Sequence, residues 1–289
     1  MPRPPKLSFE FFPPRSVDAS FRLWDAVKGL APLGPEFVSV TYGAGGTTRK
    51  LTQEAACAIG GRTGLDVAAH LTCVEATRAE TLSVAQSYLD AGINRLVALR
   101  GDPPKTVTNF TPHPDGFASS VELVSGLREL ADFEIWVGAY PDTHPEAASA
   151  EADIDWLKRK LDAGAHGAIT QFFFDADTFF RFRDRCCAAG ITAPIIPGLM
   201  PIENWRKARN FAQRCGTNIP AELDQAFEIA IRDDRHDLLA IAQATELAST
   251  LVDAGVEHLH FYTLNRFELT RDVAIALGAP YPQPLRNVA

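Results

Sequence analysis

Short stretches rich in β-branched and aromatic residues alternate with amphipathic stretches along the whole 289-residue chain. The alternation recurs about every 27 to 40 residues, the length of one strand followed by one helix, which is typical of a parallel sheet buried on both faces. The gap before the last strand is longer and leaves room for an extra helix. The expected strands are residues 7–12, 37–41, 66–71, 94–99, 134–140, 168–173, 194–197 and 257–262, and the clearest helices are residues 76–90, 146–162, 178–189 and 238–253.

An Ala-Gly pair ends four of the helical stretches just before a strand. The glycines are Gly92, Gly164, Gly190 and Gly255. Glycine at this place adopts the left-handed conformation that stops a helix without a Cβ penalty. The repeated device supports a fold built from repeated units.

Eight strands with a helix after each favour a (β/α)₈ TIM barrel over an open doubly wound sheet. The dinucleotide fingerprint of the open sheet is missing, since residues 43–48 read Gly-Ala-Gly-Gly-Thr-Thr, with Thr48 where the third glycine belongs. No Pro- or Ser-rich linker and no shift in composition divides the chain. We therefore expect one barrel domain over residues 1–289.

The formal net charge of −8 argues against nucleic acid and anionic membrane surfaces as partners, because both require clustered basic residues. No apolar run approaches the roughly 18 residues that span a bilayer, and the first residues lack the apolar segment of a signal peptide. The chain has five cysteines and no C-x-x-C pair, which fits reduced thiols in a cytoplasmic protein better than a disulfide framework.

The active site of such a barrel lies at the carboxyl ends of its strands. Seven of the eight expected strands end in groups that hydrogen-bond or titrate. Among them, Glu10 lies in the stretch Ser-Phe-Glu-Phe-Phe-Pro-Pro, flanked by phenylalanines. A desolvated carboxyl can keep its proton near neutral pH and act as a general acid. The alternative is a Glu10 that points to solvent while its neighbours point inward, and composition favours neither.

Other candidate site residues, at strand ends and on the helix expected over residues 146–162, each allow a functional and a structural interpretation. Arg100 beside a glycine could reach a phosphate or could pair with Asp102 to shape a turn. Gln171 could bind the edge of a heteroaromatic ring or be incidental in a core strand. His144 is more often structural in such a loop, and Asp153, Trp156 and Lys160 share one helix face that could line a cofactor groove or meet solvent.

The sequence offers little support for a metal or a serine nucleophile. His258 and His260 share one side of a strand, but no third ligand stands at a recognisable spacing. No H-E-x-x-H, Cys/His cluster or G-x-S-x-G motif is present. We expect no metal.

Seven short motifs occur in order from Leu7 to about Arg271. They are Ser-Phe-Glu-Phe-Phe-Pro-Pro, Val-Thr-Tyr-Gly-Ala, His-Leu-Thr-Cys, Leu-Arg-Gly-Asp, Ala-Tyr-Pro followed by His-Pro-Glu-Ala, Ile-Thr-Gln-Phe-Phe-Phe-Asp and Phe-Tyr-Thr-Leu-Asn-Arg. Each motif alone is weak, but the ordered set resembles the bacterial methylenetetrahydrofolate reductases.

This resemblance implies an FAD-dependent barrel without a Rossmann domain. NADH or NADPH would pass a hydride to the flavin and leave, and 5,10-methylenetetrahydrofolate would then take the hydride and become 5-methyltetrahydrofolate, in a ping-pong sequence. Glu10 would be the general acid that helps to open the folate ring, and Asp102 would tune the flavin and stabilise the developing cation. The resemblance also implies a homo-oligomer.

The resemblance assigns two further sets of residues. The folate- and nicotinamide-binding set is Thr41, Asp102, Gln171, Lys207, Phe211 and Arg266. The FAD-binding set is Tyr42, Ala44, His70, Arg100, Gly101, Asp102, Ala118, Tyr140, His144, Ala147, Asp153, Trp156, Arg159 and Lys160, in which Arg159 and Lys160 would meet the phosphates.

Two residues depart from the family pattern. Phe117 stands where a Tyr is expected near the flavin, and Lys207 stands where a Gln is expected near the folate. Nothing is carried over for residues 103–116. No residues remain for the regulatory domain of longer relatives, which binds S-adenosylmethionine, so we expect no such feedback.

Three other functions remain open from the sequence. The chain could be another flavin barrel, such as a proline dehydrogenase, or a folate-binding module without turnover. It could also be a metal-dependent aldolase-type barrel, which would lose activity to a chelator. The choice between NADH and NADPH, the physiological direction and the oligomeric state are not decided by the sequence.

Overall fold

The computed structural model describes residues 4–42, 49–102 and 111–280. Within these residues, all strands are parallel and join one sheet in the order β7-β6-β5-β4-β3-β2-β1-β9-β8. The strands are β1 (Lys6–Phe11), β2 (Phe37–Val40), β3 (Val67–Thr72), β4 (Arg95–Leu99), β5 (Glu134–Ala139), β6 (Gly167–Thr170), β7 (Ile195–Ile196), β8 (Gly198–Leu199) and β9 (His258–Tyr262).

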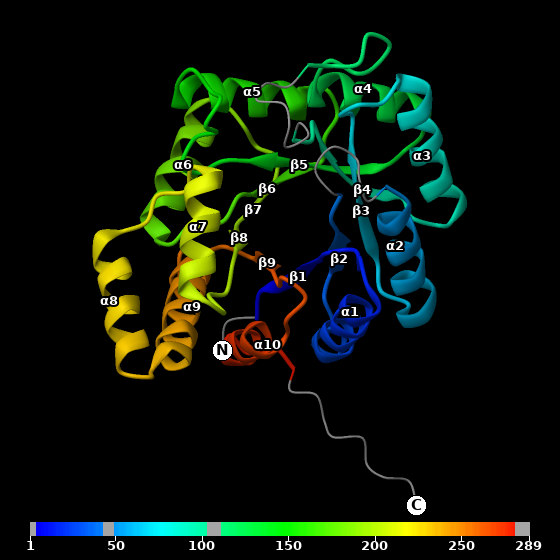
Figure 1. Ribbon diagram of the computed structural model, residues 1–289. Helices are drawn as coiled ribbons and strands as arrows, with labels where there is room; N and C mark the ends of the chain where they lie inside the picture. The colour runs from blue at the N-terminus through cyan, green and yellow to red at the C-terminus, as the bar shows by residue number, and fades with distance from the viewer. Residues whose placement is uncertain (1–3, 43–48, 103–110, 281–289) are drawn as a thin grey trace, which may run out of the picture.

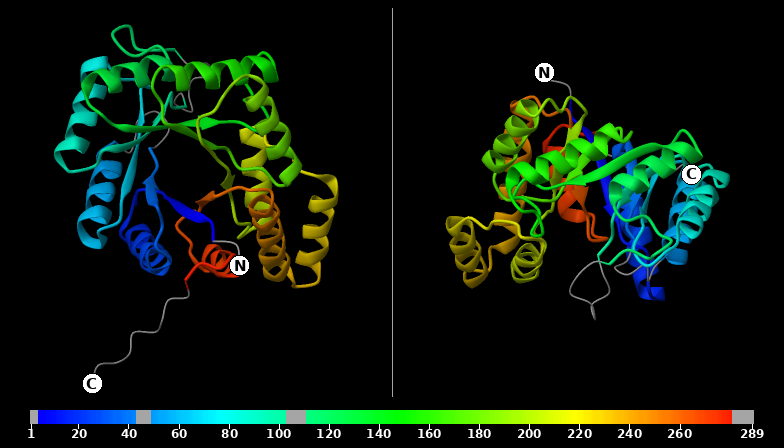
Figure 2. Two further views of the ribbon diagram at one scale, coloured as in Figure 1. Left: turned by 180° about the vertical axis from the view of Figure 1, so that it is seen from behind. Right: turned by 90° about the horizontal axis from the view of Figure 1, so that it is seen from above.

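Helices cover the outside of this sheet, as Figures 1 and 2 show. They are α1 (Val17–Leu30), α2 (Arg49–Thr63), α3 (Arg78–Asp90), α4 (Ser120–Leu130), α5 (Ala150–Asp162), α6 (Ala176–Ala188), α7 (Trp205–Cys215), α8 (Ala221–Arg232), α9 (His236–Asp253) and α10 (Glu268–Ala276), with a short 3₁₀ turn, Ala31–Leu33, after α1. The expected TIM barrel is confirmed. The long gap before the last strand holds α7, α8 and α9.

The seventh expected strand is divided into β7 and β8. β7 pairs with β6 and β8 pairs with β9, and Pro197 separates them. Proline has no N–H to donate to a ladder, so it interrupts the pairing at this point. The two short strands together close the barrel between β6 and β9.

Most helices begin at a residue whose side chain accepts a hydrogen bond from the first turn. Ser16, Thr77, Ser119, Ser149, Asp175 and Asn204 do so, and Thr77 forms a capping box with Glu80. Such a cap stabilises a helix by about 1 kcal/mol. The helix ends follow the expected pattern, since the four glycines of the Ala-Gly pairs all have positive φ angles between 77° and 114°.

The apolar core has two parts. The larger part lies between the strands and the surrounding helices. The smaller part fills the inside of the barrel and consists of Phe37, Ala68, Val97, Trp136, Ile169 and Ile196. Because side chains alternate between the two faces of a strand, Phe9 and Phe11 belong to the outer part while Glu10 points into the barrel.

Candidate active site

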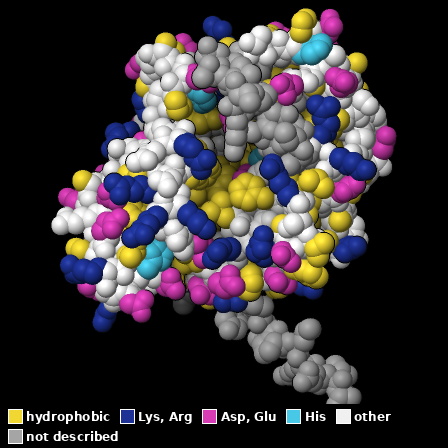
Figure 3. All heavy atoms as spheres, in the orientation of Figure 1, with side chains coloured by type: hydrophobic (Ala, Val, Ile, Leu, Met, Phe, Trp, Pro, Cys, Tyr) yellow, Lys and Arg dark blue, Asp and Glu magenta, His cyan; other side chains and the backbone are white. Residues whose placement is uncertain are grey.

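A cavity of about 660 Å³ opens at the carboxyl ends of the strands. This volume is within the usual range for small-molecule sites. Figure 3 shows apolar side chains in the central hollow and Lys and Arg side chains around it. The lining comes from nearly every strand end: Glu10, Phe12, Pro13, Arg15, Ala19, Arg22, Thr41, Tyr42, His70, Val97, Leu99, Gly138, Ala139, Tyr140, Ile169, Gln171, Phe211, Tyr262, Leu264 and Asn265.

Glu10 lies between two histidines from different strands. Its Oε2 is 3.3 Å from Nε2 of His70 on β3 and 3.8 Å from Nε2 of His260 on β9. The side chain of Glu10 is only 13% exposed, and those of His70 and His260 are 8% and 1% exposed. Both Nε2 atoms are buried without another hydrogen-bond partner among the described residues. Among the described residues, the carboxylate is therefore the one acceptor that these nitrogens face.

The protonation state of Glu10 differs from both sequence-based alternatives. Burial raises its pKa, but the contacts with the imidazoles of His260 and His70 together outweigh burial and lower the pKa from 4.5 to about 2. Glu10 is neither exposed nor surrounded by phenyl rings, because its phenylalanine neighbours point to the other face of β1. The expectation that burial alone keeps this carboxyl protonated is wrong for the free protein.

Seven of the predicted site residues line the cavity: Glu10, Thr41, Tyr42, His70, Tyr140, Gln171 and Phe211. The Tyr42 hydroxyl accepts a hydrogen bond from Nε of Arg49 at 2.8 Å. Oε1 of Gln171 accepts from the Phe172 backbone at 3.0 Å. Since no partner occupies the Gln171 amide nitrogen within the described ranges, this amide is free to donate to a ligand.

The cavity wall also holds two aromatic faces. Phe211 on α7 stacks on Phe172, with ring centroids 5.3 Å apart and the planes inclined by 27°. The rings of Tyr140 and His144 are nearly perpendicular, with centroids 4.5 Å apart. Burial, as the largest cause, raises the pKa of Tyr140 beyond its usual range, so its hydroxyl stays protonated. These rings provide flat surfaces for a planar ligand.

The remaining predicted residues do not line the cavity. Arg100 makes a two-point ion pair with Glu146, at 2.5 and 3.1 Å. Asp153 accepts a hydrogen bond from the His144 backbone at 2.8 Å. Gly101, Asp102, Ala118, Ala147, Trp156 and Arg159 also lie off the lining, and Ala44 is outside the described residues.

Lys160 is buried and donates to the Gly138 carbonyl at the end of β5. Burial lowers its pKa to about 8. Its contact with the strand end places its charge beneath the cavity wall.

Lys207, Arg266 and Phe117 also lie off the lining. Lys207 is exposed in the first turn of α7, and Arg266 pairs with Glu203 at 3.5 Å. Phe117 is fully buried, with the Arg78 guanidinium 4.7 Å from its ring centroid. The missing hydroxyl at Phe117 therefore affects the core more directly than the cavity.

Sequence reasoning did not single out the lining residues Arg15, in the turn before α1, and Arg22, on α1. Tyr262 and Asn265 lie in the last of the seven motifs, at the end of a strand, but the sequence assigned them no role. Asn265 holds the backbone of Phe12 by two hydrogen bonds, at 2.8 and 3.0 Å. Tyr262 donates its hydroxyl to the Thr170 carbonyl at 2.6 Å. The closed barrel expected from the sequence requires the first and last strands to pair, and that pairing could have predicted Tyr262 and Asn265 beside Glu10.

Two absences hold for the part of the chain that the structure describes. No group of three or more His, Cys, Asp or Glu side chains is arranged to hold a metal ion. No helix is long and apolar enough to cross a membrane.

Comparisons with known proteins agree with the fold. A solved Clostridium thermocellum protein, which binds two copies of 5-methyl-5,6,7,8-tetrahydrofolic acid, superposes with a TM-score of 0.66 at 13% identity, over 96% of this chain and 94% of that chain. Identity this low supports the barrel fold alone.

Sequence comparison is more specific. The 5,10-methylenetetrahydrofolate reductase of Escherichia coli K12 is 46% identical over 94% of this chain and 90% of its own length, and that of Salmonella typhimurium is 45% identical with the same coverage. Methylenetetrahydrofolate reductase (NADH) 1 of Arabidopsis thaliana is 37% identical over 94% of this chain and 48% of its own length. The methylenetetrahydrofolate reductase family model matches residues 3–278. The chain is therefore an oxidoreductase that belongs to the methylenetetrahydrofolate reductase family.

Proposed function

We propose that this protein reduces 5,10-methylenetetrahydrofolate to 5-methyltetrahydrofolate, using FAD and a hydride from NADH or NADPH. The observation that carries the proposal is Glu10, a buried carboxylate on the floor of a large cavity that is open at the barrel mouth. The reaction needs a proton on a folate nitrogen and a hydride on the one-carbon unit. Because Glu10 is ionised in the free protein, it must take up a proton before it can supply one to the folate.

The residues at the mouth fit a flavin. The cavity has aromatic walls at Tyr140 and Phe211, and the amide nitrogen of Gln171 in the same lining has no hydrogen-bond partner among the described residues. An amide donor beside aromatic faces suits the polar edge of a flat ring system. Tyr42, His70 and Tyr140 would hold the flavin, with Arg100 just after the end of β4.

When bound, FAD supplies a carrier that accepts a hydride from the nicotinamide and gives it to the folate. The protein orients the ligands and controls protons. The Gln171 amide nitrogen donates to the ring edge of either substrate, and Phe211 stacks on it. Tyr262 and Leu264 close the wall beside Glu10 and exclude water.

Glu10 acts on the folate alone. It donates its proton as the five-membered ring opens to a cationic iminium, and the negative carboxylate that remains stabilises that cation. Asp102, exposed just after β4, adds negative charge at the rim. His70 and His260 position the carboxylate, because their Nε2 atoms face the same oxygen, Oε2.

The test is sequential anaerobic mixing of the purified protein. The yellow flavin colour should bleach with NADH or NADPH and return when methylenetetrahydrofolate is added. Return of colour with proline-derived imine and not with folate would indicate a proline dehydrogenase. A protein that stays colourless when offered FAD would contradict the proposal, and retention of folate without turnover would indicate a binding module.

The same mixing experiment decides the hydride donor, since the preferred nucleotide bleaches the flavin at the lower concentration. We also infer a homo-oligomer. Large apolar side chains are exposed on the helices, with Phe21 of α1 at 66% and Leu238 of α9 at 62% exposure, and such residues suit an interface. Sedimentation of the purified protein tests this inference.

A further inference from the structure

A row of polar side chains continues from Glu10 down the inside of the barrel. Nδ1 of His260 is 2.8 Å from Oγ of Ser8, and the same Oγ is 3.0 Å from Nε2 of His258. Ser8 and His260 are fully buried, whereas His258 is half-buried at the start of β9. The strand register explains the row, because Ser8 pairs with His260 and Glu10 pairs with Tyr262.

The direction of the hydrogen bonds in this row is set by His258, at the amino-terminal end of the barrel. When Nε2 of His258 donates to Ser8, the Ser8 hydroxyl is left to donate to Nδ1 of His260. The proton of His260 is then on Nε2, the nitrogen that faces the Glu10 carboxylate. The opposite order leaves Nε2 of His260 bare, and it then suits only a protonated Glu10.

The two orders therefore correspond to the two protonation states of Glu10. We propose that His258, Ser8 and His260 form a proton relay that reprotonates Glu10 from the amino-terminal end of the barrel. The proposal deepens the proposed function and rests on it. It solves a problem that the site poses, because ligands in the mouth would cover Glu10 from the solvent on that side.

The transfer moves one proton and no electrons. A proton from solvent adds to Nδ1 of His258 as the proton on Nε2 passes to Oγ of Ser8. The Ser8 hydroxyl proton passes to Nδ1 of His260. Nε2 of His260 and Oε2 of Glu10 are 3.8 Å apart, which is longer than a hydrogen bond, so these two side chains must approach each other before the Nε2 proton passes to Oε2. Each residue of the row gains one proton and loses one, and only Glu10 ends with an added proton.

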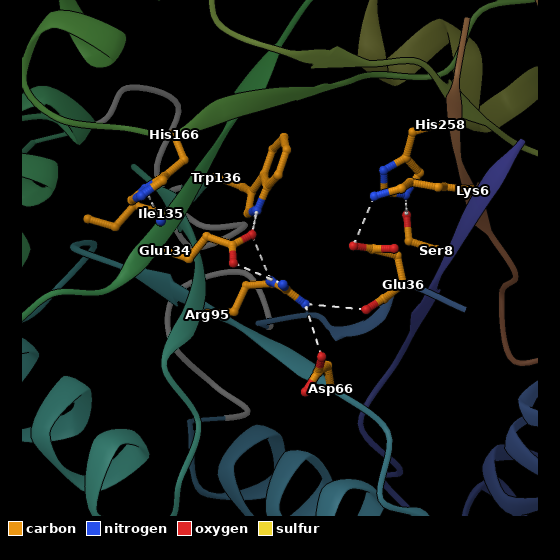
Figure 4. Close-up of polar contacts among 10 residues, drawn as sticks. All are labelled: Lys6, Ser8, Glu36, Asp66, Arg95, Glu134, Ile135, Trp136, His166 and His258. Carbon is orange, nitrogen blue, oxygen red and sulfur yellow. Dashed lines mark hydrogen bonds and ion pairs between the residues drawn. The ribbon is translucent and has the colours of Figure 1, made fainter. Parts of the chain in front are cut away.

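The charged groups around His258, at the amino-terminal end of the barrel, favour its neutral form. Lys6 is opposite His258 in the sheet and pairs with Glu36 at 3.2 Å, as Figure 4 shows. Arg95 lies nearby and pairs with Glu134 and Asp66.

Burial, as the largest cause, lowers the pKa of His258 to about 3, with the charges of His260, Lys6 and Arg95 acting in the same direction. Burial likewise lowers the pKa of His260. Neutral imidazoles can both donate and accept, which a relay requires.

Ser8→Ala tests the relay with the smallest change. It removes one buried oxygen, and the space left is too small for a replacement water. We expect the rate of flavin reoxidation by methylenetetrahydrofolate to fall at least about tenfold, within the range for lost proton transfer. Flavin reduction by NADH, which needs no proton from Glu10, should be unchanged. Ser39→Ala is the matched control, since Ser39 is also a fully buried barrel serine and its Oγ has no hydrogen-bond partner among the described residues.

His258→Gln breaks the relay at its far end and serves if Ser8→Ala does not fold. Because both substitutions break the same path, the double variant should be no slower than the slower of the two single variants. If the two substitutions slow flavin reoxidation additively, or if a variant slows flavin reduction and reoxidation equally, the residues have a structural role and the relay is overturned. An unchanged folate half-reaction in both variants would overturn it too.

Nitrogen NMR of the histidine rings gives a readout that does not depend on turnover. At neutral pH the free protein should carry the His260 proton on Nε2, and Ser8→Ala should release His258 from its single tautomer. A wild-type His260 with its proton on Nδ1 would overturn the relay. If the wild-type flavin is not reoxidised by folate, the proposed function fails instead, while the NMR result still tests the hydrogen-bond order.

Discussion

The depressed pKa of Glu10 predicts a specific dependence of stability on pH. The pKa falls from 4.5 to about 2 on folding, and each unit corresponds to about 1.4 kcal/mol. The ionised carboxylate therefore contributes about 3 kcal/mol to the free energy of unfolding. A depressed folded pKa means that this contribution is complete above pH 4.5 and is lost as the pH falls toward 2. About 2 kcal/mol of it should be lost by pH 3.

Glu10→Gln removes this titration and keeps the shape of the side chain. Urea unfolding of both proteins at pH 6 and pH 3 gives the comparison. The wild type should lose about 2 kcal/mol more than Glu10→Gln between these two pH values. Other carboxyls titrate in both proteins, so their contributions cancel.

Glu203→Gln is the control of opposite sign. Burial, as the largest cause, raises the pKa of Glu203, so the wild type should gain stability relative to that variant as the pH falls. Parallel losses in the wild type and Glu10→Gln would refute the argument that the two imidazoles outweigh burial at Glu10.

Two further predictions concern the framework of the cavity. Gly198→Ala should lower the free energy of unfolding by about 1–3 kcal/mol and lower activity, because its Cβ would lie 2.2 Å from the Thr170 carbonyl and 2.5 Å from the Tyr262 ring. Gly61→Ala is the control, since its Cβ has open space around it, and it should leave the free energy of unfolding unchanged or raise it by up to about 1 kcal/mol. Thermal or urea unfolding measures both variants. Asn265→Ala should remove both hydrogen bonds to the Phe12 backbone and lower the free energy of unfolding by about 1–3 kcal/mol. The KM for folate should rise. An unchanged unfolding midpoint would contradict this role of Asn265.

The repeating pattern of the chain predicted the fold because each unit is local. Every expected strand is present within a few residues, and the glycines after the helices have the expected positive φ. The division at Pro197 was not predicted, because a four-residue run gives no sign of which neighbour each half pairs with. That choice depends on the closure of the whole barrel.

The surroundings of Glu10 show where the sequence argument failed. Its nearest neighbours in sequence, Phe9 and Phe11, lie on the other face of β1, and the groups that set its pKa come from β3 and β9. His260 was visible as one of two histidines on a strand, but only the pairing of the first and last strands brings it beside Glu10. Local composition cannot reveal a contact across 250 residues.

The helix after β5 shows a second limit. Lys160 shares a helical spacing with Asp153 and Trp156, which left open whether their common face lines a cofactor groove or meets solvent. In the structure Lys160 is buried against Gly138, Asp153 caps the turn at His144, and Trp156 is exposed. Spacing by itself does not distinguish an inward-facing charge from one that meets solvent.

The central claim is that Glu10 supplies the proton for folate reduction and has no part in hydride transfer from the nicotinamide. Anaerobic single-turnover measurements on Glu10→Gln test it most directly, because the two half-reactions are followed separately through the flavin colour. We predict that NADH bleaches the variant at the wild-type rate and that reoxidation by methylenetetrahydrofolate is slower by about 100-fold or more. Reoxidation at the wild-type rate would contradict the account.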